Sequence, residues 1–294
     1  SPAPYAYRNH TQFVLTADGK PGYHRAESAS IVAIDHCAII DTMLDEKLRH
    51  WSDDNNVTSH QRLVSAGSTN KGQAIEVHLR LGINTGESAT YLDESSQNGN
   101  HDLNQDVIHE VVGEYRYRIS PGSFFQVNTV VATLIVAHVV SELNLNGHEN
   151  VLDLYCGVGL FTVPIAVRAG TVIGVESNLI AASDAMINLA EFKNARVMAL
   201  ESSRALATWE TPASFDAVVV DPPRAGIDQL TLNEMQRLSA PQIIYVSCDP
   251  ATLARDARLL CDRGYRMSTI QPFDMFPQTH HVETVATFTK IADV

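Results

Sequence analysis

The chain has 294 residues, 45% of them apolar and 19% charged, a balance typical of a globular protein long enough for two domains. Its 21 basic and 34 acidic residues give a net charge of −13, which argues against indiscriminate binding to polyanions but allows a local basic groove. Four widely spaced cysteines without a CxxC pair predict the reduced thiols of a cytoplasmic protein. No run of about 18 apolar residues and no signal-peptide pattern occurs, so we expect no membrane association.

The residue pattern changes near position 120, and residues 1–122 predict a small β-rich α+β domain. Short alternating apolar runs are separated there by clusters of Gly, Asn, Asp and Ser, which is typical of strands joined by irregular turns. The expected strands cover residues 8–16, 30–34, 74–81, 90–92 and 115–119. We expect one amphipathic helix over residues 40–51 and a polar loop over residues 95–106.

Residues 123–294 predict a second domain in which strands and helices alternate. The expected helices cover residues 129–143, 161–169, 179–192 and a segment from 250 to a stop at Gly264. The expected strands cover residues 151–154, 171–175, 196–200, 217–220, 243–246 and 284–289. Such alternation indicates a parallel-rich sheet covered on both faces, a Rossmann-like α/β fold that binds ligands at the carboxyl ends of its strands.

A glycine-containing loop follows the first strand of this second domain. Gly157 and Gly159 allow a tight turn and the close approach of a ligand to the backbone. Glu176, at the end of the next strand, is placed to hold two ribose hydroxyls. Asp153 would repel a pyrophosphate but attract a methionine ammonium group, and Thr162 replaces the third glycine of a dinucleotide fingerprint. The loop therefore predicts S-adenosylmethionine, with an NAD oxidoreductase as a distant alternative.

A second loop carries Asp221, two prolines and Arg224. The prolines fix an extended turn just after a strand. Asp221 can accept a hydrogen bond from a base edge or from the cofactor, and Arg224 can bind a phosphate or carboxylate through two parallel bonds. This arrangement is typical of enzymes that methylate nucleobases.

Cys248 ends another strand and precedes a helix. Pro250 suits the first helical position and Asp249 suits the N-cap. The helix dipole then favours a thiolate at Cys248, so the residue is a candidate nucleophile. A buried free cysteine without chemistry is the alternative, since cysteine is among the most often buried residues.

Five segments, taken together and in this order, resemble the S-adenosylmethionine-dependent RNA (uracil-C5)-methyltransferases, which make 5-methyluridine in tRNA and rRNA. They are residues 124–128, 153–161, 221–226, 247–250 and 281–285. The resemblance also includes residues 5–9 and 22–25, so that it covers most of the chain. It implies that residues 123–294 form a class I methyltransferase domain and that the first domain contacts RNA.

The resemblance also implies a mechanism and a set of site residues. A thiolate of Cys248 would add to C6 of uridine, and Glu283 would remove the C5 proton after methylation. The candidate cofactor contacts are Gln126, Asp153, Tyr155, Gly157, Gly159, Glu176, Glu201 and Asp221. Phe125 is expected to stack on an extruded uridine. The candidate RNA contacts are Arg224, Tyr7 and Arg8, followed by Tyr5, Arg25, Arg116 and Arg118.

Three features depart from the family pattern. Leu160 stands where some members have an asparagine that contacts the cofactor. Cys37 matches the last of four ligands to a [4Fe–4S] cluster, but the earlier three would lie upstream of Ser1, so we expect no cluster in this chain. An N-terminal β-barrel RNA-binding domain would also lie upstream. Either these segments were truncated or this lineage lost them.

The predicted function is methylation of C5 of a specific uridine, in a monomer whose partner is RNA. Residues 22–25 and 34–37 favour 23S-type rRNA over tRNA as the substrate. Two alternatives remain open. One is an N-methyltransferase that acts on an exocyclic amino group, with a structural Cys248. The other is a catalytically inactive RNA-binding or chaperone relative.

Overall fold

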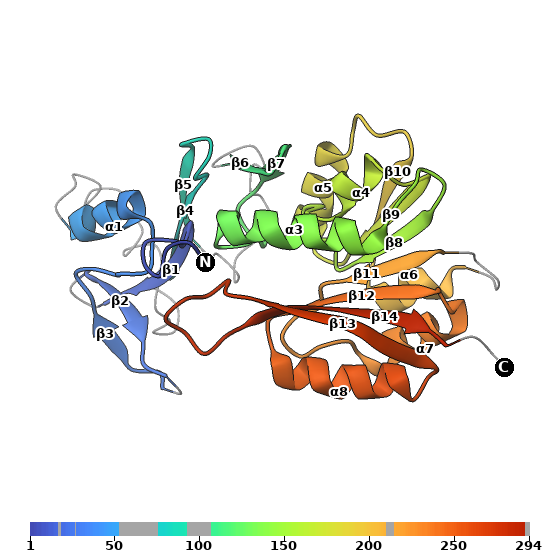
Figure 1. Cartoon of the computed structure of the whole chain (residues 1–294). Helices are drawn as coiled ribbons and strands as arrows, with labels where there is room; N and C mark the ends of the chain where they lie inside the picture. The colour runs from blue at the N-terminus through green and yellow to red at the C-terminus, as the bar shows by residue number, and fades with distance from the viewer. Residues whose placement is uncertain (17–18, 27, 53–75, 93–106, 210–214, 292–294) are drawn as a thin grey trace. The chain divides into compact units, whose positions relative to one another are not determined.

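A computed structural model describes residues 1–16, 19–26, 28–52, 76–92, 107–209 and 215–291. The chain divides into two compact units, one formed by Ala3–Ile108 and one by His109–Val294 with Ser1–Pro2 (Figure 1). The predicted boundary fell after residue 122. Strand β7 (Tyr115–Ile119), expected in the first domain, therefore belongs to the second unit, together with nearly all of β6 (Ile108–Val112).

The first unit is built on a five-stranded antiparallel sheet packed against one helix. The strand order is β3-β2-β1-β4-β5, with β1 at His10–Leu15, β2 at Pro21–His24, β3 at Ile31–Ala33, β4 at Glu76–Leu81 and β5 at Ser88–Leu92. Helix α1 (Thr42–Arg49) starts at Asp41, whose side chain accepts a hydrogen bond from the amide of Met43. Leu44 and Leu48 of α1 are buried against the apolar side chains of β1 and β4. The polar loop predicted over residues 95–106 lies outside the described residues.

The second unit contains a seven-stranded sheet of order β10-β9-β8-β11-β12-β14-β13. Its first five strands are parallel, and β14 and β13 complete it with antiparallel pairings. The bounds are β8 Asn150–Leu154, β9 Thr171–Glu176, β10 Ala195–Ala199, β11 Ala217–Val220, β12 Gln242–Ser247, β13 Tyr265–Phe273 and β14 Glu283–Lys290. The predicted α/β class with a parallel-rich sheet is confirmed.

Nearly every residue of β8, β11 and β12 is buried. Since successive side chains of a strand point to opposite faces, both faces of this sheet are covered, as expected for a parallel sheet between helices. Helices α3 and α8 lie on opposite sides of β12 and β14 (Figure 1). The helix bounds are α3 Thr129–Leu143, α4 Thr162–Ala166, α5 Leu179–Asn188, α6 Ser202–Ala207, α7 Gln229–Leu238 and α8 Pro250–Cys261. None of the helices described combines the length and apolar composition needed to cross a membrane.

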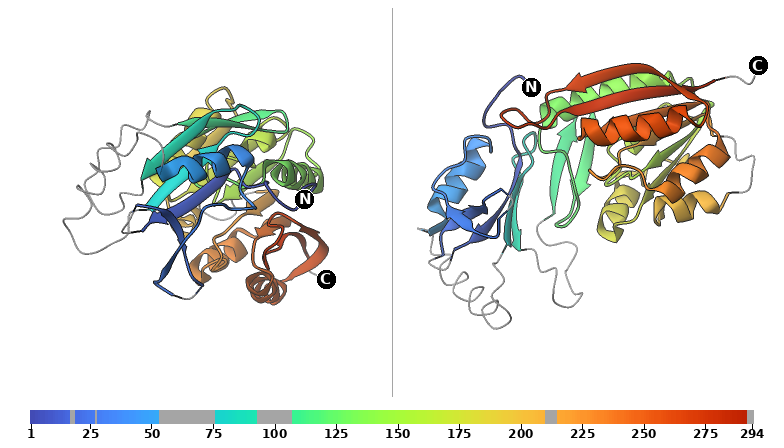
Figure 2. Two further views of the ribbon diagram at one scale, coloured as in Figure 1. Left: turned by 90° about the vertical axis from the view of Figure 1, so that its left-hand side faces the viewer. Right: turned by 90° about the horizontal axis from the view of Figure 1, so that it is seen from below.

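Strand β13 was not predicted. It forms one edge of the sheet beside β14 and α8 (Figure 2), and most of its residues are exposed. An exposed edge strand needs no apolar alternation, so the pattern that reveals half-buried strands is absent from it. The short elements β2, β6, α6 and α7 were missed as well.

Candidate functional site

Three parallel strands and one antiparallel strand bring candidate residues to one edge of the sheet. Asp153 lies in β8, Asp221 follows β11 and Cys248 follows β12, and these parallel strands end at the same edge. Glu283 begins β14, which runs antiparallel to β12 and therefore starts where β12 ends. Four groups that are far apart in the sequence are thus neighbours at the ligand-binding edge of an α/β sheet.

Cys248 and Glu283 lie near each other at the ends of two adjacent strands. Ser247 pairs with Thr284 at the last position of the β12–β14 ladder, so the next residues outward are Cys248 and Glu283. Cys248 is partly exposed, whereas Glu283 is only 2% exposed. A thiol that solvent can reach therefore lies beside a shielded carboxyl group.

Burial favours the neutral forms of these acidic groups. It raises the pKa of Glu283 to about 7. Burial, reinforced by the carboxyl groups of Glu283 and Asp153, raises the pKa of Asp221 well above its usual value. The pKa of the Cys248 thiol is raised by burial and by Glu283. Arg224 acts in the opposite direction and lowers it, while Asp221 raises it further.

The helix predicted after Cys248 is present. Asp249 caps α8 and accepts a hydrogen bond from the amide of Thr252 at 2.8 Å, and Pro250 opens the helix. From this arrangement the sequence predicts a thiolate, because a helix N-terminus attracts negative charge. In the structure, burial and the neighbouring carboxyl groups outweigh that attraction, and the pKa of the thiol lies above its ordinary value.

The loop between β8 and α4 makes a tight turn through residues with positive φ, which lets a ligand approach its backbone closely. Tyr155, Gly157 and Gly159 have φ values of +61°, +56° and +91°. The amide of Gly157 donates to Glu176 Oε2 at 2.9 Å, and the amide of Asn178 donates to Oε1 at 2.7 Å. A Cβ added to Gly157 would meet nothing within 4 Å, so one side of the loop is open to a ligand. Glu176 thus joins the loop to the end of β9.

Asp153 fits a donor from a bound ligand. The residue is fully buried, and its Oδ2 accepts a hydrogen bond from the Thr162 hydroxyl at 2.5 Å. Its Oδ1 has no hydrogen-bond partner among the described residues. Burial raises the pKa of Asp153 to about 7, with Glu176 adding to the rise. Since a buried acceptor without a donor is costly, the site suits the amino group of S-adenosylmethionine. Thr162, which replaces the third glycine of the dinucleotide fingerprint, orients this carboxyl group through its hydroxyl.

The other predicted cofactor contacts lie in different surroundings. Gln126 is buried, just before the N-cap of α3. Tyr155 is partly buried, and its hydroxyl interacts with the side chains of Thr231 and Ser202. Glu201 is exposed at the N-cap of α6, and its side chain does not cap that helix.

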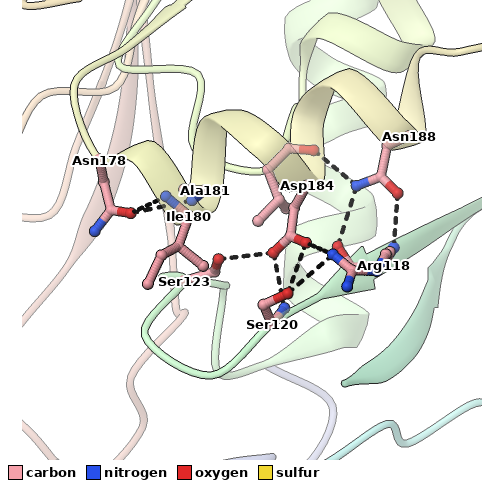
Figure 3. A network of polar contacts seen from close by, with 9 residues as sticks. Arg118, Ser120, Ser123, Asn178, Ile180, Ala181, Asp184 and Asn188 are labelled. Atoms are coloured by element: carbon pink, nitrogen blue, oxygen red, sulfur yellow. Dashed lines mark hydrogen bonds and ion pairs between the residues drawn. The ribbon is translucent and has the colours of Figure 1, made fainter. Parts of the chain in front are cut away.

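A network of polar contacts joins α5 to the segment of Arg118, Ser120 and Ser123 (Figure 3). Asp184 of α5 is fully buried and accepts hydrogen bonds from the amide and hydroxyl of Ser120 and from the hydroxyl of Ser123. It also forms an ion pair with Arg118. One turn further along α5, Asn188 donates to the carbonyl of Val158 in the loop at 2.9 Å.

This network changes the interpretation of Arg118, which the sequence suggests as an RNA contact. Its side chain is 13% exposed and its charge is paired with Asp184. Asn188 accepts a hydrogen bond from the Arg118 amide at 2.8 Å and donates one to its carbonyl at 3.1 Å. Arg118 therefore links the segment before Gln126 to α5. Sequence reasoning missed Asp184 and Asn188, and an aspartate at an inward position of a helix was the available signal.

Of the two adjacent phenylalanines, Phe124 presents its ring to solvent. Phe125 is 5% exposed, and its ring lies 5.8 Å from that of Tyr117 between centroids. Phe124 is 68% exposed. The predicted stacking residue is thus a core residue in this structure, and its neighbour has the accessible ring.

The remaining RNA candidates fall in both units. In the first unit Tyr7 is buried, Arg8 donates from Nε to the carbonyl of His10 at 3.5 Å, and Tyr5 and Arg25 are exposed. Arg116 and Arg224 of the second unit are exposed.

Cys37 packs against the core of the first unit, and its amide donates to Asp45 Oδ1 at 2.7 Å. Within the described ranges, no group of three His, Cys, Asp or Glu residues is arranged to hold a metal ion.

Residues 94–291 match the model of the tRNA (uracil-5-)-methyltransferase family. The chain belongs to this family. It is 34% identical to an uncharacterized RNA methyltransferase of Streptomyces avermitilis, over 96% of this chain and 66% of that protein. It is 32% identical to an uncharacterized RNA methyltransferase of Gloeobacter violaceus, over 97% of this chain and 71% of that protein. The chain thus spans about two thirds of the length of these relatives, and the predicted family is confirmed.

A solved structure shares the fold over nearly the whole chain. It is the Pyrococcus abyssi tRNA (uracil-54, C5)-methyltransferase in complex with S-adenosyl-L-homocysteine, which is 28% identical with a TM-score of 0.73. The match covers 98% of this chain and 77% of that protein.

Proposed function

We propose that this protein transfers a methyl group from S-adenosylmethionine to C5 of a uridine in RNA, through a covalent bond between Cys248 and C6. The observation that carries this proposal is the position of Cys248 and the buried Glu283, each one residue beyond the last pair of the β12–β14 ladder, where the two groups interact. A nucleophile and a proton acceptor on adjacent strands are what substitution at C5 requires. Membership of the tRNA (uracil-5-)-methyltransferase family supports the same reaction.

Asp153, the Gly157–Gly159 turn and Glu176 would hold the cofactor, with Gln126, Tyr155, Glu201 and Asp221 as further contacts at this edge. When bound, S-adenosylmethionine supplies an electrophilic methyl group on a sulfonium centre. The raised pKa values of Asp153 and Asp221 show that burial makes their negative charges costly. A cationic ligand would compensate that cost, which is why this edge favours a sulfonium and an ammonium group over a pyrophosphate.

The protein residues would carry the remaining steps. Once the thiol proton has left, Cys248 Sγ forms a bond to C6 of uridine, and the electron pair of the C5–C6 double bond moves to make C5 nucleophilic. After C5 has gained the methyl group, Glu283 accepts the C5 proton and the C6–S bond breaks, which restores the double bond and the thiolate. A carboxyl group with a pKa of about 7 is well suited to accept a proton near neutral pH.

RNA would be recognised as an unstacked strand, because C5 chemistry requires the target uridine to leave its stack. Phe124 supports stacking better than the predicted Phe125, since its ring is exposed. The exposed Arg224 is suited to a phosphate. The preference for 23S-type rRNA over tRNA stays a prediction, and the solved relative is a tRNA (uracil-54, C5)-methyltransferase.

The decisive experiment uses RNA that contains 5-fluorouridine. Fluorine at C5 cannot leave as a proton, so the protein should remain covalently bound after methylation. We expect a band of retarded mobility in denaturing gels, and a mass spectrum that assigns the RNA to Cys248. Cys248→Ala should form no such band, and Cys261→Ala, which removes an exposed cysteine, should form it normally.

Two results would contradict the proposal. Methylation of uridine RNA without any adduct on fluorouridine RNA would exclude the covalent mechanism. Methylation of an exocyclic amino group by the Cys248→Ala protein would favour the N-methyltransferase alternative. Parallel reactions with tRNA and 23S rRNA transcripts would identify the RNA class.

A further inference from the structure

The loop that carries Arg224 is bound directly to α8, the helix that starts just after Cys248. Three successive peptide units of this loop each bond to a side chain of α8. Thr252 Oγ1 donates to the carbonyl of Arg224 at 3.0 Å, Arg255 Nη2 donates to the carbonyl of Ala225 at 2.8 Å, and the amide of Ile227 donates to Asp256 Oδ2 at 2.9 Å. These bonds fix the backbone on both sides of Gly226.

Asp256 is the centre of this arrangement. It is fully buried, and its Oδ2 also accepts the hydroxyl of Tyr245 at 2.7 Å, while its Oδ1 accepts Arg255 Nε at 2.8 Å. Tyr245 belongs to β12, the strand that ends just before Cys248. One carboxylate therefore joins the Arg224 loop to the strand and to the helix on either side of the nucleophile.

Gly226 shows how closely the loop and helix approach each other. Its φ is +80°, and a Cβ at this position would overlap side-chain atoms of Thr252, Arg255 and Asp256. A side chain there would force these three side chains to shift or the loop to move away from α8, in a backbone conformation that L-residues rarely adopt. Gly264, at the other end of α8, has a similar φ of +86°, but a Cβ there would meet nothing within 4 Å.

We propose that Thr252, Arg255 and Asp256 are positioning residues that hold the Arg224 loop on α8, at the strand ends that carry Cys248, so that the charge of Arg224 acts on this thiol. The inference deepens the proposed function and rests on the role given there to Cys248. The charged groups that act on this thiol are Glu283 of β14 and the loop residues Asp221 and Arg224, and Arg224 alone among them lowers its pKa. The contacts to α8 would thus set how readily the thiol ionises.

The test follows alkylation of Cys248 by iodoacetamide as a function of pH, in the full chain and read by peptide mass spectrometry. Gly226→Ala and Thr252→Val should slow alkylation of Cys248 by up to about tenfold below the thiol pKa, which corresponds to a shift of one pKa unit. Arg224→Gln should do the same. Adding Gly226→Ala to Arg224→Gln should slow it no further, because both changes act through one guanidinium.

Matched variants distinguish an effect of the position of the Arg224 loop from an effect of unfolding. Gly264→Ala places the same side chain at a similar backbone angle without overlap, and it should leave the alkylation profile unchanged. Thr252→Ser restores the hydroxyl and should recover most of the wild-type rate. If Gly226→Ala does not fold, the Thr252→Val and Thr252→Ser pair still decides. Folding is checked by circular dichroism and thermal unfolding.

Wild-type alkylation profiles in folded Thr252→Val and Arg224→Gln proteins would overturn this inference. Alkylation needs neither RNA nor S-adenosylmethionine, so its outcome is independent of the fluorouridine experiment. If fluorouridine RNA forms no adduct while the alkylation profiles shift as expected, the proposed function fails and the contacts to Arg224 stand. The opposite pair of results would retain the function and reject the positioning role.

Discussion

The carboxyl groups in the two halves of the sheet edge have different surroundings. On the side of β9 and α5, Glu176 accepts two backbone amides and Asp184 accepts amide, hydroxyl and guanidinium donors. On the side of β11, β12 and β14, Asp221 and Glu283 lie close to each other, and burial raises the pKa of both. The first half uses carboxylates to fix the backbone, whereas burial in the second half favours the neutral forms of its carboxyl groups.

Asp153 lies between the two halves and shares features of both. Its Oδ2 is bound by Thr162, as in the first half, while its Oδ1 has no partner in the described part of the chain and its pKa rises to about 7, as in the second. This division predicts that substitutions on the β12–β14 side change turnover, whereas those on the β8–β9 side change stability and ligand binding.

The largest effect is expected from Cys248→Ala. Without the thiol, C5 of uridine stays a poor nucleophile, so incorporation of radiolabelled methyl groups into RNA should be abolished. Cys261→Ala is the control, since its cysteine lies at the exposed end of α8. Substantial turnover in Cys248→Ala would show that Cys248 is not the nucleophile and that the β12–β14 side does not carry the covalent step.

Glu283→Gln should lower kcat by about 10²–10⁴-fold, the usual contribution of a general base. Because Glu283 acts late, the methylated RNA should accumulate as an adduct on Cys248, visible in denaturing gels even with ordinary uridine RNA. Glu234→Gln, on the surface of α7, is the control and should behave as wild type.

The pH profile gives a second readout. Glu283 accepts a proton only when ionised, so kcat of the wild type should fall as pH decreases through about 7. Glu283→Gln should lose this dependence. A wild-type profile that stays flat between pH 6 and about 8 would exclude Glu283 as the base.

Much of this arrangement could be predicted from the sequence, because strand ends are recognisable from local patterns. Helix α3 was predicted with its observed bounds, Thr129–Leu143, and Cys248 was correctly predicted to lie between a strand and a helix. The loop glycines 157 and 159 indeed have positive φ. These features depend on residues that are close in the sequence.

The parts that could not be predicted depend on partners far away in the sequence. Asp184 binds Ser120 and Arg118, more than 60 residues earlier, so neither its role nor that of Arg118 follows from a local pattern. The pKa of Cys248 is raised by Glu283, which lies on a later strand. This effect opposes that of the helix N-terminus after Cys248, which could be predicted from the sequence. The roles of Asp184 and Arg118 and the pKa of Cys248 thus depend on contacts between residues that are distant in the sequence.

Asp184→Ala tests the structural half. It removes the acceptor for Arg118 and for the Ser120 and Ser123 hydroxyls, and it should lower the free energy of unfolding by about 3 kcal/mol, as for other broken buried ion pairs. Urea unfolding measures this loss. Asp262→Ala breaks an exposed ion pair with Arg258 and should cost less than about 1 kcal/mol. Equal losses in the two variants would show that the network does not stabilise the fold.

The smallest effect, and the one that joins the two halves, is expected from Asp153→Asn. Because the pKa of Asp153 is raised in the fold from 3.8 to about 7, the unfolded chain releases this proton more easily than the folded one. The wild-type contribution is therefore fully present below about pH 4 and is lost as pH rises through about 7. An asparagine does not ionise, so Asp153→Asn should be more stable than the wild type at pH 8, by roughly 1–3 kcal/mol.

The same variant should bind S-adenosylhomocysteine more weakly, by roughly tenfold, because the neutral amide attracts an ammonium group less than a carboxylate does. Thermal unfolding at pH 5 and pH 8, with and without this ligand, measures both effects in one series. A gain in stability together with a loss of affinity would mean that Asp153 is kept for ligand binding at the expense of the fold. If stability at pH 8 falls and affinity is unchanged, Asp153 belongs with Asp184 as a structural carboxylate, and the boundary between the two halves lies between β8 and β11.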